Sequence, residues 1–325
     1  MIICRTPLRV SLFGGGSDIP AYFEQNSGAV LSFTINKYIY TSIHPLIESN
    51  QILLKYSKNE LVEKVADIKH PVFRKILERY SIAGIDISVS SDVAAGTGLG
   101  SSSAFTVNIL QLIKEYLGYS YSKRSLAEEA CEIELEQLKE PIGLQDQFAS
   151  AFGNFNLLEF SKNKEVAVTP LEQFTEIDKL ISKNMILIRV GGLRSAQDVL
   201  NVQISSMSDM QKQVTLSQMA EQARQAFRKI QHGPEWIGKL LHEAWILKKS
   251  LSPIISNKDV DDLYEHLLEL GVYGGKLLGA GKSGYFLVIA EEEVIDQIKN
   301  LKNLLTLSIA RDRDGSRIIY KSEDL

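Results

Sequence analysis

The sequence predicts an α+β protein of two domains, and three observations lead to this prediction. Its 325 residues suffice for two domains of ordinary size. The first hundred residues are rich in strand-like segments, with a helix among them. A second alternation of strands and helices begins at residue 184, at the end of the polar stretch LEQFTEIDKLISKN. We therefore place the domain boundary near residue 183, and expect domains of residues 1–183 and 184–325 with a cleft between them.

Three segments of the N-terminal part have strand patterns. Residues 7–13 and 29–46 are apolar or alternate, and the segment 85–93 alternates clearly from Ile85 to Val89, as half-buried strands do. A helix is indicated between the last two by apolar residues at helical spacing, namely Val72, Phe73, Ile76, Leu77 and Tyr80.

A glycine-rich turn at 96–100 follows the third strand, and two helices come after it. The second of these helices covers residues 124–139 and is closed by Pro141 and Gly143. The first carries a core-facing stripe with the spacing i, i+4, i+7, i+8, i+11, formed by Phe105, Ile109, Leu112, Ile113 and Tyr116.

The C-terminal part begins with a strand at 184–192, followed by helical stretches around 195–230 and 234–252. A further helix then leads through a glycine turn into a strand at 284–290. This turn contains Gly281, Lys282 and Ser283, the last three letters of a P-loop. The first P-loop glycine would fall on Lys276, and a helix rather than a strand precedes the turn. The sequence therefore argues against a P-loop here.

The overall composition excludes several classes of protein. The formal net charge is −4, whereas nucleic-acid binders show a basic face, so we expect no nucleic-acid partner. Two cysteines and five histidines, with no Cys-x-x-Cys, argue against a disulfide framework and a zinc site. No signal peptide and no run of about 18 apolar residues is visible. We expect a soluble, cytoplasmic enzyme without a membrane partner, as a monomer or homodimer.

The segment of residues 90–113 is the candidate site for the phosphates of a nucleotide. A strand leads into Gly96, Gly98, Leu99 and Gly100, and these lead into a helix. Glycines allow close backbone approach to a ligand, and the helix start offers free N–H groups and a favourable dipole to phosphate. The helix starts with hydroxyl groups that could bind phosphate or metal, those of Ser101, Ser102 and Ser103. The alternative is a tight turn in which a serine merely caps the helix.

Three motifs resemble those of the GHMP kinases, the superfamily of galactokinase, homoserine kinase, mevalonate kinase and phosphomevalonate kinase. The first motif is similar to RTPLRVSLFGGGSDIP (5–20), the second to GTGLGSSSA (96–104) and the third to GGKLLGAGKSGYFLV (274–288). Ala94 replaces the proline that usually begins the second motif. Within the superfamily the chain most resembles the D-glycero-D-manno-heptose 7-phosphate kinases, through RTPLR…GGGSD, GLQDQFASAFGNFN and GGKLLGAG.

The resemblance implies a two-domain fold, with an N-terminal domain like domain 2 of ribosomal protein S5 and a ferredoxin-like C-terminal domain. It implies ATP and Mg²⁺ as cofactors and phosphorylation of a sugar phosphate at its anomeric hydroxyl. The expected acceptor is D-glycero-D-manno-heptose 7-phosphate, and the expected product is the 1,7-bisphosphate. Two alternatives stay open: a kinase of a free sugar such as fucose or galactose, and a catalytically silent sensor of sugar or nucleotide.

Glu134 is the candidate metal ligand, together with the Ser102 hydroxyl. Glu134 lies on the apolar stripe of its helix, and a carboxylate that faces inward must be paired or metal-bound. A buried salt bridge is the alternative. The resemblance implies the metal, because the family places a Mg²⁺-binding glutamate on this helix.

Asp146 stands where the family has its catalytic aspartate, near the start of a helix. Its carboxylate could accept the proton of the sugar hydroxyl. Arg9 aligns with a family arginine close to the aspartate and the transferring phosphate. The alternatives are an ordinary helix-start acid for Asp146 and a strand-edge surface arginine for Arg9.

The acceptor sugar is expected to contact both glycine loops. Asp18 would bind sugar hydroxyls, and Gly15 and Gly16 would leave room for it, although Asp18 could also be only a turn residue. We assign Gly279 and Gly281 of the third motif to the same substrate site. The role of Lys282 is undecided from the sequence.

Two arginines are candidates for the phosphate of the acceptor. Arg5 precedes Arg9 by four residues, so an extended strand would place both side chains on one face. Arg194 lies just before a predicted helix start, where an anion would be favoured. An ordinary capped surface turn is the alternative for Arg194.

Overall fold

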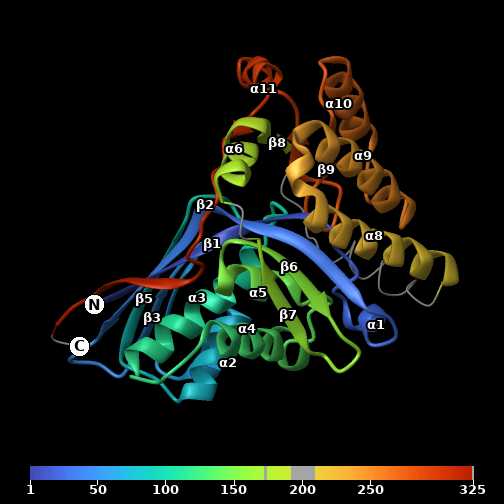
Figure 1. Cartoon of the computed structure of the whole chain (residues 1–325). Helices are drawn as coiled ribbons and strands as arrows, with labels where there is room; N and C mark the ends of the chain where they lie inside the picture. Colours follow the sequence, from blue (N-terminus) through green and yellow to red (C-terminus); the bar gives the residue numbers. More distant parts are fainter. Residues whose placement is uncertain (172–173, 192–208, 324–325) are drawn as a thin grey trace.

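The computed structural model of the chain describes residues 1–171, 174–191 and 209–323. Within these ranges the chain forms an eight-stranded sheet and a four-stranded sheet, with helices packed on each (Figure 1). The α+β fold class expected from the sequence is confirmed.

The larger sheet has the strand order β12-β1-β2-β5-β3-β4, and β6, with β7 beside it, also pairs with β2. The two ends of strand β2 pair with different strands on the same side: residues 28–33 pair with β6, and residues 39–45 pair with β5. Figure 1 shows α2, α3, α4 and α5 on one side of this sheet. The elements of this part are β1 (Ile2–Phe13), α1 (Pro20–Phe23), β2 (Gly28–Pro45), β3 (Ile52–Lys55), β4 (Asn59–Val62), the 3₁₀ turn η1 (Val65–Asp67), α2 (Pro71–Tyr80), β5 (Ile85–Ser91), α3 (Ser101–Tyr116), α4 (Lys123–Cys131), the π-helical turn η2 (Glu132–Gln137), α5 (Gln145–Phe152), β6 (Phe155–Phe160) and β7 (Val166–Pro170).

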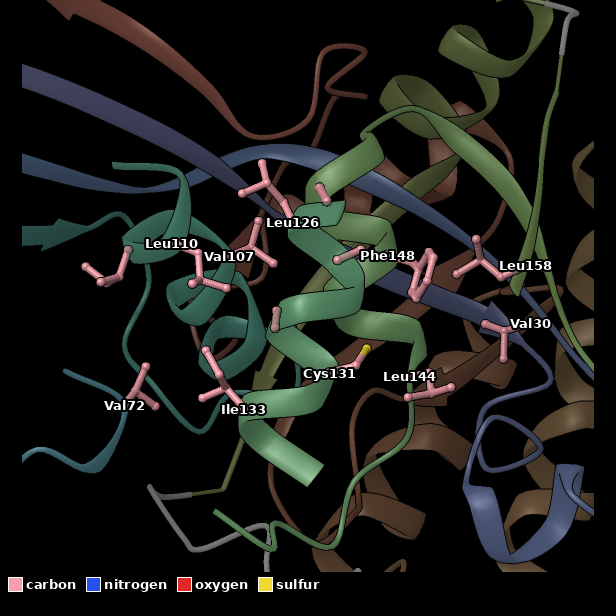
Figure 2. Close-up of a cluster of buried hydrophobic side chains, with 14 of the residues drawn as sticks. Val30, Val72, Val107, Leu110, Leu126, Cys131, Ile133, Leu144, Phe148 and Leu158 are labelled. Carbon is pink, nitrogen blue, oxygen red and sulfur yellow. The ribbon is translucent and has the colours of Figure 1, made fainter. Parts of the chain in front are cut away.

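An apolar layer joins these helices to the sheet. In Figure 2, Val107 of α3, Leu126 of α4 and Phe148 of α5 lie in one cluster with Val30 of β2. Each is at most 2% exposed. Burying a side chain of this size contributes roughly 1.5–3 kcal/mol. The cluster thereby holds α3 and α5 in place, and both helices begin at the site described below.

The pairing of β1 with β2 changes register between Pro7 and Arg9. Alternate side chains of β1 therefore point to opposite sides of the sheet before and after this position. Before this irregularity Cys4 belongs to the core beneath the helices, and after it Leu8 belongs to the core that faces the smaller sheet. A bulge of this kind turns the following side chains to the other face. Arg5 and Arg9 therefore lie on opposite faces, and the expectation that they share one face is wrong.

The smaller sheet is antiparallel, with the order β11-β8-β10-β9. Helix α8 packs against β1 and β2 of the larger sheet, and α9 packs against β9 and β10. The elements are α6 (Phe174–Asn184), β8 (Met185–Val190), α8 (Met210–Lys229), the 3₁₀ turn η3 (Ile230–His232), α9 (Pro234–Ser250), α10 (Lys258–Glu269), β9 (Gly274–Leu277), β10 (Gly284–Ile289), α11 (Glu292–Lys299), β11 (Thr306–Leu307) and β12 (Arg317–Lys321).

Residues 274–277 form strand β9, whereas the sequence predicted a helix that leads directly into the glycine turn. A Cβ atom on Gly274 would lie 1.9 Å from the carbonyl oxygen of Gly238 in α9, so this helix packs directly on the strand backbone. The turn is confined to residues 278–283 and joins two strands. A P-loop, which joins a strand to a helix, is therefore not formed there, as expected.

The boundary near residue 183 remains a prediction. The smaller sheet begins with β8, directly after α6. Strand β12, however, pairs with β1, so the chain returns to the larger sheet at its end. The backbone N–H of Ser322 donates to the carbonyl oxygen of Met1, and Figure 1 shows both chain ends side by side. The predicted C-terminal domain of residues 184–325 therefore includes a strand, β12, that belongs to the larger sheet.

Candidate active site

A cavity of about 230 Å³ lies between the elements around the larger sheet and those around the smaller sheet. Its wall is formed by β1 and the turn after it, residues 96–103, the start of α5, α8, α9, β9 and the turn after β9. The residues in this wall that the sequence analysis had selected are Arg9, Gly15, Gly16, Asp18, Gly96, Gly98, Gly100, Ser101, Ser102, Ser103, Asp146 and Gly279.

The N-terminus of α3 faces the cavity. Gly100 is the N-cap residue, and no side chain caps the helix. The alternative of a serine-capped turn is therefore wrong, since the three serines occupy the first turn and line the cavity. Free N–H groups and the helix dipole at such a terminus favour an anion.

The glycines of this loop also join the two parts of the chain. Gly96, Gly98 and Gly100 have φ angles of 73°, 82° and 73°, which favour glycine. A Cβ atom on Gly98 would lie 2.5 Å from the carbonyl oxygen of Leu278, and one on Gly279 would lie 2.6 Å from the Cα of Gly98. The second and third motifs thus touch backbone to backbone, which requires glycine independently of any ligand.

Arg9 and Asp146 form a bidentate ion pair at the cavity wall. Nε and Nη2 of Arg9 each donate to one carboxylate oxygen of Asp146 at 2.6 Å. Nη1 of Arg9 donates to the carbonyl oxygen of Gly98 at 2.6 Å. Arg9 is only 5% exposed, so the alternative of a surface arginine is wrong. Such paired, charge-assisted bonds fix the orientation of the Asp146 carboxylate in the first turn of α5.

Glu134 lies in the π-helical turn η2 and is 1% exposed, so the expectation that it faces inward is confirmed. Oε1 accepts a hydrogen bond from Thr106 at 2.7 Å and Oε2 from Gln147 at 2.6 Å. Burial raises the pKa of Glu134 to about 7, against the effect of the Thr106 and Ser103 hydroxyls. No basic side chain of the described residues pairs with Glu134, so the salt-bridge alternative does not hold there.

Asp18 is held rigidly in the wall. Its Oδ1 accepts hydrogen bonds from the Gly16 N–H at 2.8 Å and from Nε2 of Gln145 at 3.0 Å, and burial raises its pKa. A Cβ atom on Gly143 would lie 1.9 Å from Oδ2 of Asp18, so this glycine makes room for the carboxylate. Asp18 therefore stabilises its own turn and also lines the cavity. Beside it, Oγ of Ser11 and Oε1 of Gln145 have no hydrogen-bond partner in the described structure.

Two buried lysines in the wall were missed by the sequence analysis, Lys248 of α9 and Lys276 of β9. They are 7% and 3% exposed. A signal existed for Lys248, because it continues the helical stripe of Leu241, Ala244 and Trp245 at the position i+7. No comparable signal marked Lys276, whose place depends on the packing of β9 against α9.

Leu99 and Arg5 do not line the cavity. Leu99 is fully buried, and its carbonyl oxygen accepts a hydrogen bond from the Arg9 N–H at 3.0 Å. Arg5 stacks over the Tyr38 ring at 4.2 Å and pairs with Asp312 at 3.5 Å. Leu99 therefore supports Arg9, while Arg5 is engaged on the opposite face of β1.

The remaining candidates also lie outside the wall. Glu134 stands behind Ser103, and Gly281 packs against Ile255, whose carbonyl oxygen would lie 2.8 Å from a Cβ atom on Gly281. Lys282 is not part of the wall, and its N–H donates to the same carbonyl oxygen at 2.9 Å. Arg194 lies outside the described residues.

Comparison with known proteins assigns the family. Sequence models of the GHMP kinases N terminal domain and the GHMP kinases C terminal match residues 60–154 and 223–303. The chain is 30% identical over 315 residues to a D-glycero-alpha-D-manno-heptose 7-phosphate kinase of Campylobacter jejuni, with 92% of each chain covered. The chain therefore belongs to the GHMP kinase family, and as a member of it the chain is an ATP-dependent kinase.

Other relatives carry the names of sugar kinases. A galactokinase of Thermotoga neapolitana is 25% identical over 330 residues, with 92% of each chain covered. A crystal structure titled as a D-glycero-D-manno-heptose 1-phosphate kinase from Bacteroides thetaiotaomicron superposes with a TM-score of 0.79 at 24% identity, covering 99% of this chain and 100% of that one. A galactokinase of Lactococcus lactis superposes with a TM-score of 0.74 at 14% identity, covering 97% and 94%. Both structures show that the fold is shared.

In the described part of the chain, none of the helices combines the length and the apolar character that a membrane span needs.

Proposed function

We propose that the protein transfers the terminal phosphoryl group of ATP to the anomeric hydroxyl of a sugar phosphate, with D-glycero-D-manno-heptose 7-phosphate as the acceptor. One observation carries the proposal: the Arg9–Asp146 pair and the free N-terminus of α3 share one cavity. The 30% identical relative supports the choice of acceptor.

In this proposal each group of residues has a separate role in the reaction. The α3 N-terminus, with Ser101, Ser102 and Ser103, binds the nucleotide phosphates through N–H and hydroxyl groups. Asp146 accepts the proton of the acceptor hydroxyl as its oxygen attacks phosphorus. Arg9 holds both carboxylate oxygens of Asp146 in place, so the base is oriented before the substrate arrives.

Mg²⁺ is part of the proposal, because the residues present fit it. The Glu134 carboxylate is buried without a cationic partner in the described structure, and the serine hydroxyls of α3 supply further oxygen ligands. Mg²⁺ is commonly held by one or two carboxylates together with substrate phosphates. Glu134 and Ser102 would hold the ion, which when bound neutralises phosphate charge.

Asp18 with its neighbours would bind the sugar. Its carboxylate can accept hydrogen bonds from hydroxyl groups, and the unpartnered Oγ of Ser11 and Oε1 of Gln145 add a donor and an acceptor for sugar hydroxyls. Gly15 and Gly16 leave the space open. We propose that the phosphate of the acceptor binds Arg194, although this residue lies outside the described structure.

A kinase of a free sugar is the second candidate, and the galactokinase relative favours it. An ADP-release assay over a panel of sugars and sugar phosphates tests the choice. We expect turnover of heptose 7-phosphate above that of free heptose, galactose and fucose. Faster turnover of a free sugar would refute the acceptor that we propose, and no turnover of any panel member would favour the silent sensor.

The Arg194→Ala variant tests the acceptor phosphate site in the same assay. The KM for the sugar phosphate should rise roughly 10- to 150-fold, since charge-assisted hydrogen bonds are worth about 1.5–3 kcal/mol. The KM for ATP should stay the same. An unchanged KM for the sugar phosphate would place its phosphate elsewhere.

Cytoplasmic location and the monomer or homodimer state remain predictions.

A further inference from the structure

Lys248 and Lys276 bring two side-chain amines to one wall of the cavity, on the side of the smaller sheet. Nζ of Lys248 donates to the carbonyl oxygens of Leu277 at 2.8 Å and Gly279 at 2.5 Å. Nζ of Lys276 donates to the carbonyl oxygen of Leu12 at 2.9 Å. Within the described residues, neither amine has a carboxylate within ion-pair distance. Both therefore lack a counter-ion among the residues that the structure describes.

Their surroundings add further positive charge. The Arg9 guanidinium is close enough to lower the pKa of both lysines, after the larger effect of burial, and Lys276 lowers that of Lys248. Asp146, which lines the same cavity, is already bound by Arg9 through both oxygens. Burying a charge without a partner is strongly unfavourable. An anion in the cavity would remove this disadvantage.

A purely structural role explains less of the arrangement. Lys276 links β9 to β1, and Lys248 links α9 to the turn after β9. A neutral amide could make the same hydrogen bonds to carbonyl oxygens without a buried charge. Lys248 donates two hydrogen bonds and Lys276 one, so a protonated amine at each position keeps at least one N–H for a ligand.

We propose that Lys248 and Lys276 form, with Arg9, the subsite for the phosphoryl group in transfer, first as the terminal phosphate of ATP and then as the new phosphate of the product. The inference rests on the proposed function. In the step, the bond from phosphorus to the bridging oxygen of ADP breaks and the bond to the acceptor oxygen forms. The acceptor proton passes to Asp146, and ADP leaves with the bridging oxygen.

The position of the pair distinguishes this phosphate from the one that the acceptor already carries. The lysines line the same cavity as Arg9, whose charge lowers the pKa of both, and Arg9 holds Asp146, the base that we propose for the reacting hydroxyl. A phosphate at the far end of a sugar cannot occupy the place beside its own reacting hydroxyl. The subsite therefore belongs to the transferring group.

The test compares binding of AMP-PNP, which has a terminal phosphoryl group, with binding of ADP, which has none. The variants are Lys248→Met and Lys276→Met. Lys249→Met is the matched control, because Lys249 is the next residue on α9, lies outside the cavity wall and pairs with Asp261. Each cavity variant should bind AMP-PNP roughly tenfold or more weakly, as for a lost charge-assisted bond, and ADP unchanged. The control should bind both like the wild type.

Three results would overturn the proposal. Equal weakening of both nucleotides, with a lower melting temperature of the ligand-free variants, would assign the lysines a structural role. Unchanged AMP-PNP binding would exclude them from the subsite. A raised KM for the sugar phosphate alone would assign them to the phosphate of the acceptor. Since nucleotide binding needs no sugar, this test stands even if heptose 7-phosphate is not the substrate.

Discussion

Replacing Lys276 by methionine should change how the stability of the ligand-free protein depends on pH. Lys276 is 3% exposed, and burial, with the nearby charge of Arg9, lowers its pKa from 10.5 to about 7. Between these two values the unfolded chain binds a proton that the folded chain does not. Raising the pH in this window therefore stabilises the folded state. The group that faces Lys276 from α9 is Lys248, whose pKa is lowered in the same direction.

The size of the effect follows from the two pKa values. Protonation linkage gives Lys276 alone a rise of about 2 kcal/mol in the free energy of unfolding between pH 7 and pH 9. Methionine has a similar length and no charge, so the variant should lack this rise and be more stable than the wild type near pH 7. The effect of Lys276 on the pKa of Lys248 contributes to the same difference.

Urea unfolding at pH 7, 8 and 9 measures the effect for the wild type, Lys276→Met and Lys249→Met. Groups that titrate in this range elsewhere in the protein contribute equally to all three proteins and cancel in the comparison. The Lys249→Met control should keep the pH slope of the wild type. Parallel pH profiles for wild type and Lys276→Met would show that Lys276 is not a buried amine of low pKa. This result would also contradict the conclusion that Lys276 is buried in the cavity wall without a counter-ion.

Three further variants test the site. Asp146→Asn should keep nucleotide affinity but lose roughly 10²–10⁴-fold in kcat, the usual range for a general base, and turnover within about threefold of wild type would exclude that role. Glu134→Gln should need more Mg²⁺ for full activity, because an amide is a poorer ligand to a hard cation, while the exposed Glu136→Gln should not; an identical Mg²⁺ dependence of both variants would contradict the metal assignment. Gly143→Ala places a Cβ atom 1.9 Å from Oδ2 of Asp18, so the KM for the acceptor should rise while the KM for ATP stays constant, and a change in neither would remove Asp18 from the sugar site.

Local patterns in the sequence were sufficient to predict the strands and helices whose burial follows from the spacing of neighbouring residues. The expected segment 29–46 is strand β2, and the stripe from Phe105 to Tyr116 lies within α3, because alternation and helical spacing report which side of a segment is buried. The inward position of Glu134 followed from the same spacing, although its helix continues as a π-helical turn there. The close approach of Arg9 to Asp146 came from the resemblance to the family, and the structure shows the contact.

Features that depend on long-range packing could not be predicted in this way. The faces of Arg5 and Arg9 depend on an irregularity in the pairing of β1 with β2, which spacing within β1 does not reveal. Lys276 faces the cavity because glycines let β9 approach α9 closely, a contact between distant parts of the chain. The glycines of the two motifs were assigned to ligands alone, whereas Gly98 and Gly279 also require each other.

The central claim is that ATP phosphorylates the anomeric oxygen of a sugar that already carries a phosphate. Phosphorus NMR of a reaction of the protein with ATP, Mg²⁺ and D-glycero-D-manno-heptose 7-phosphate tests it most directly. We expect one new resonance coupled to the anomeric proton, persistence of the original phosphate resonance, and ADP in equal amount. Heptose 7-phosphate recovered unchanged, while galactose or fucose is phosphorylated under the same conditions, would contradict the claim.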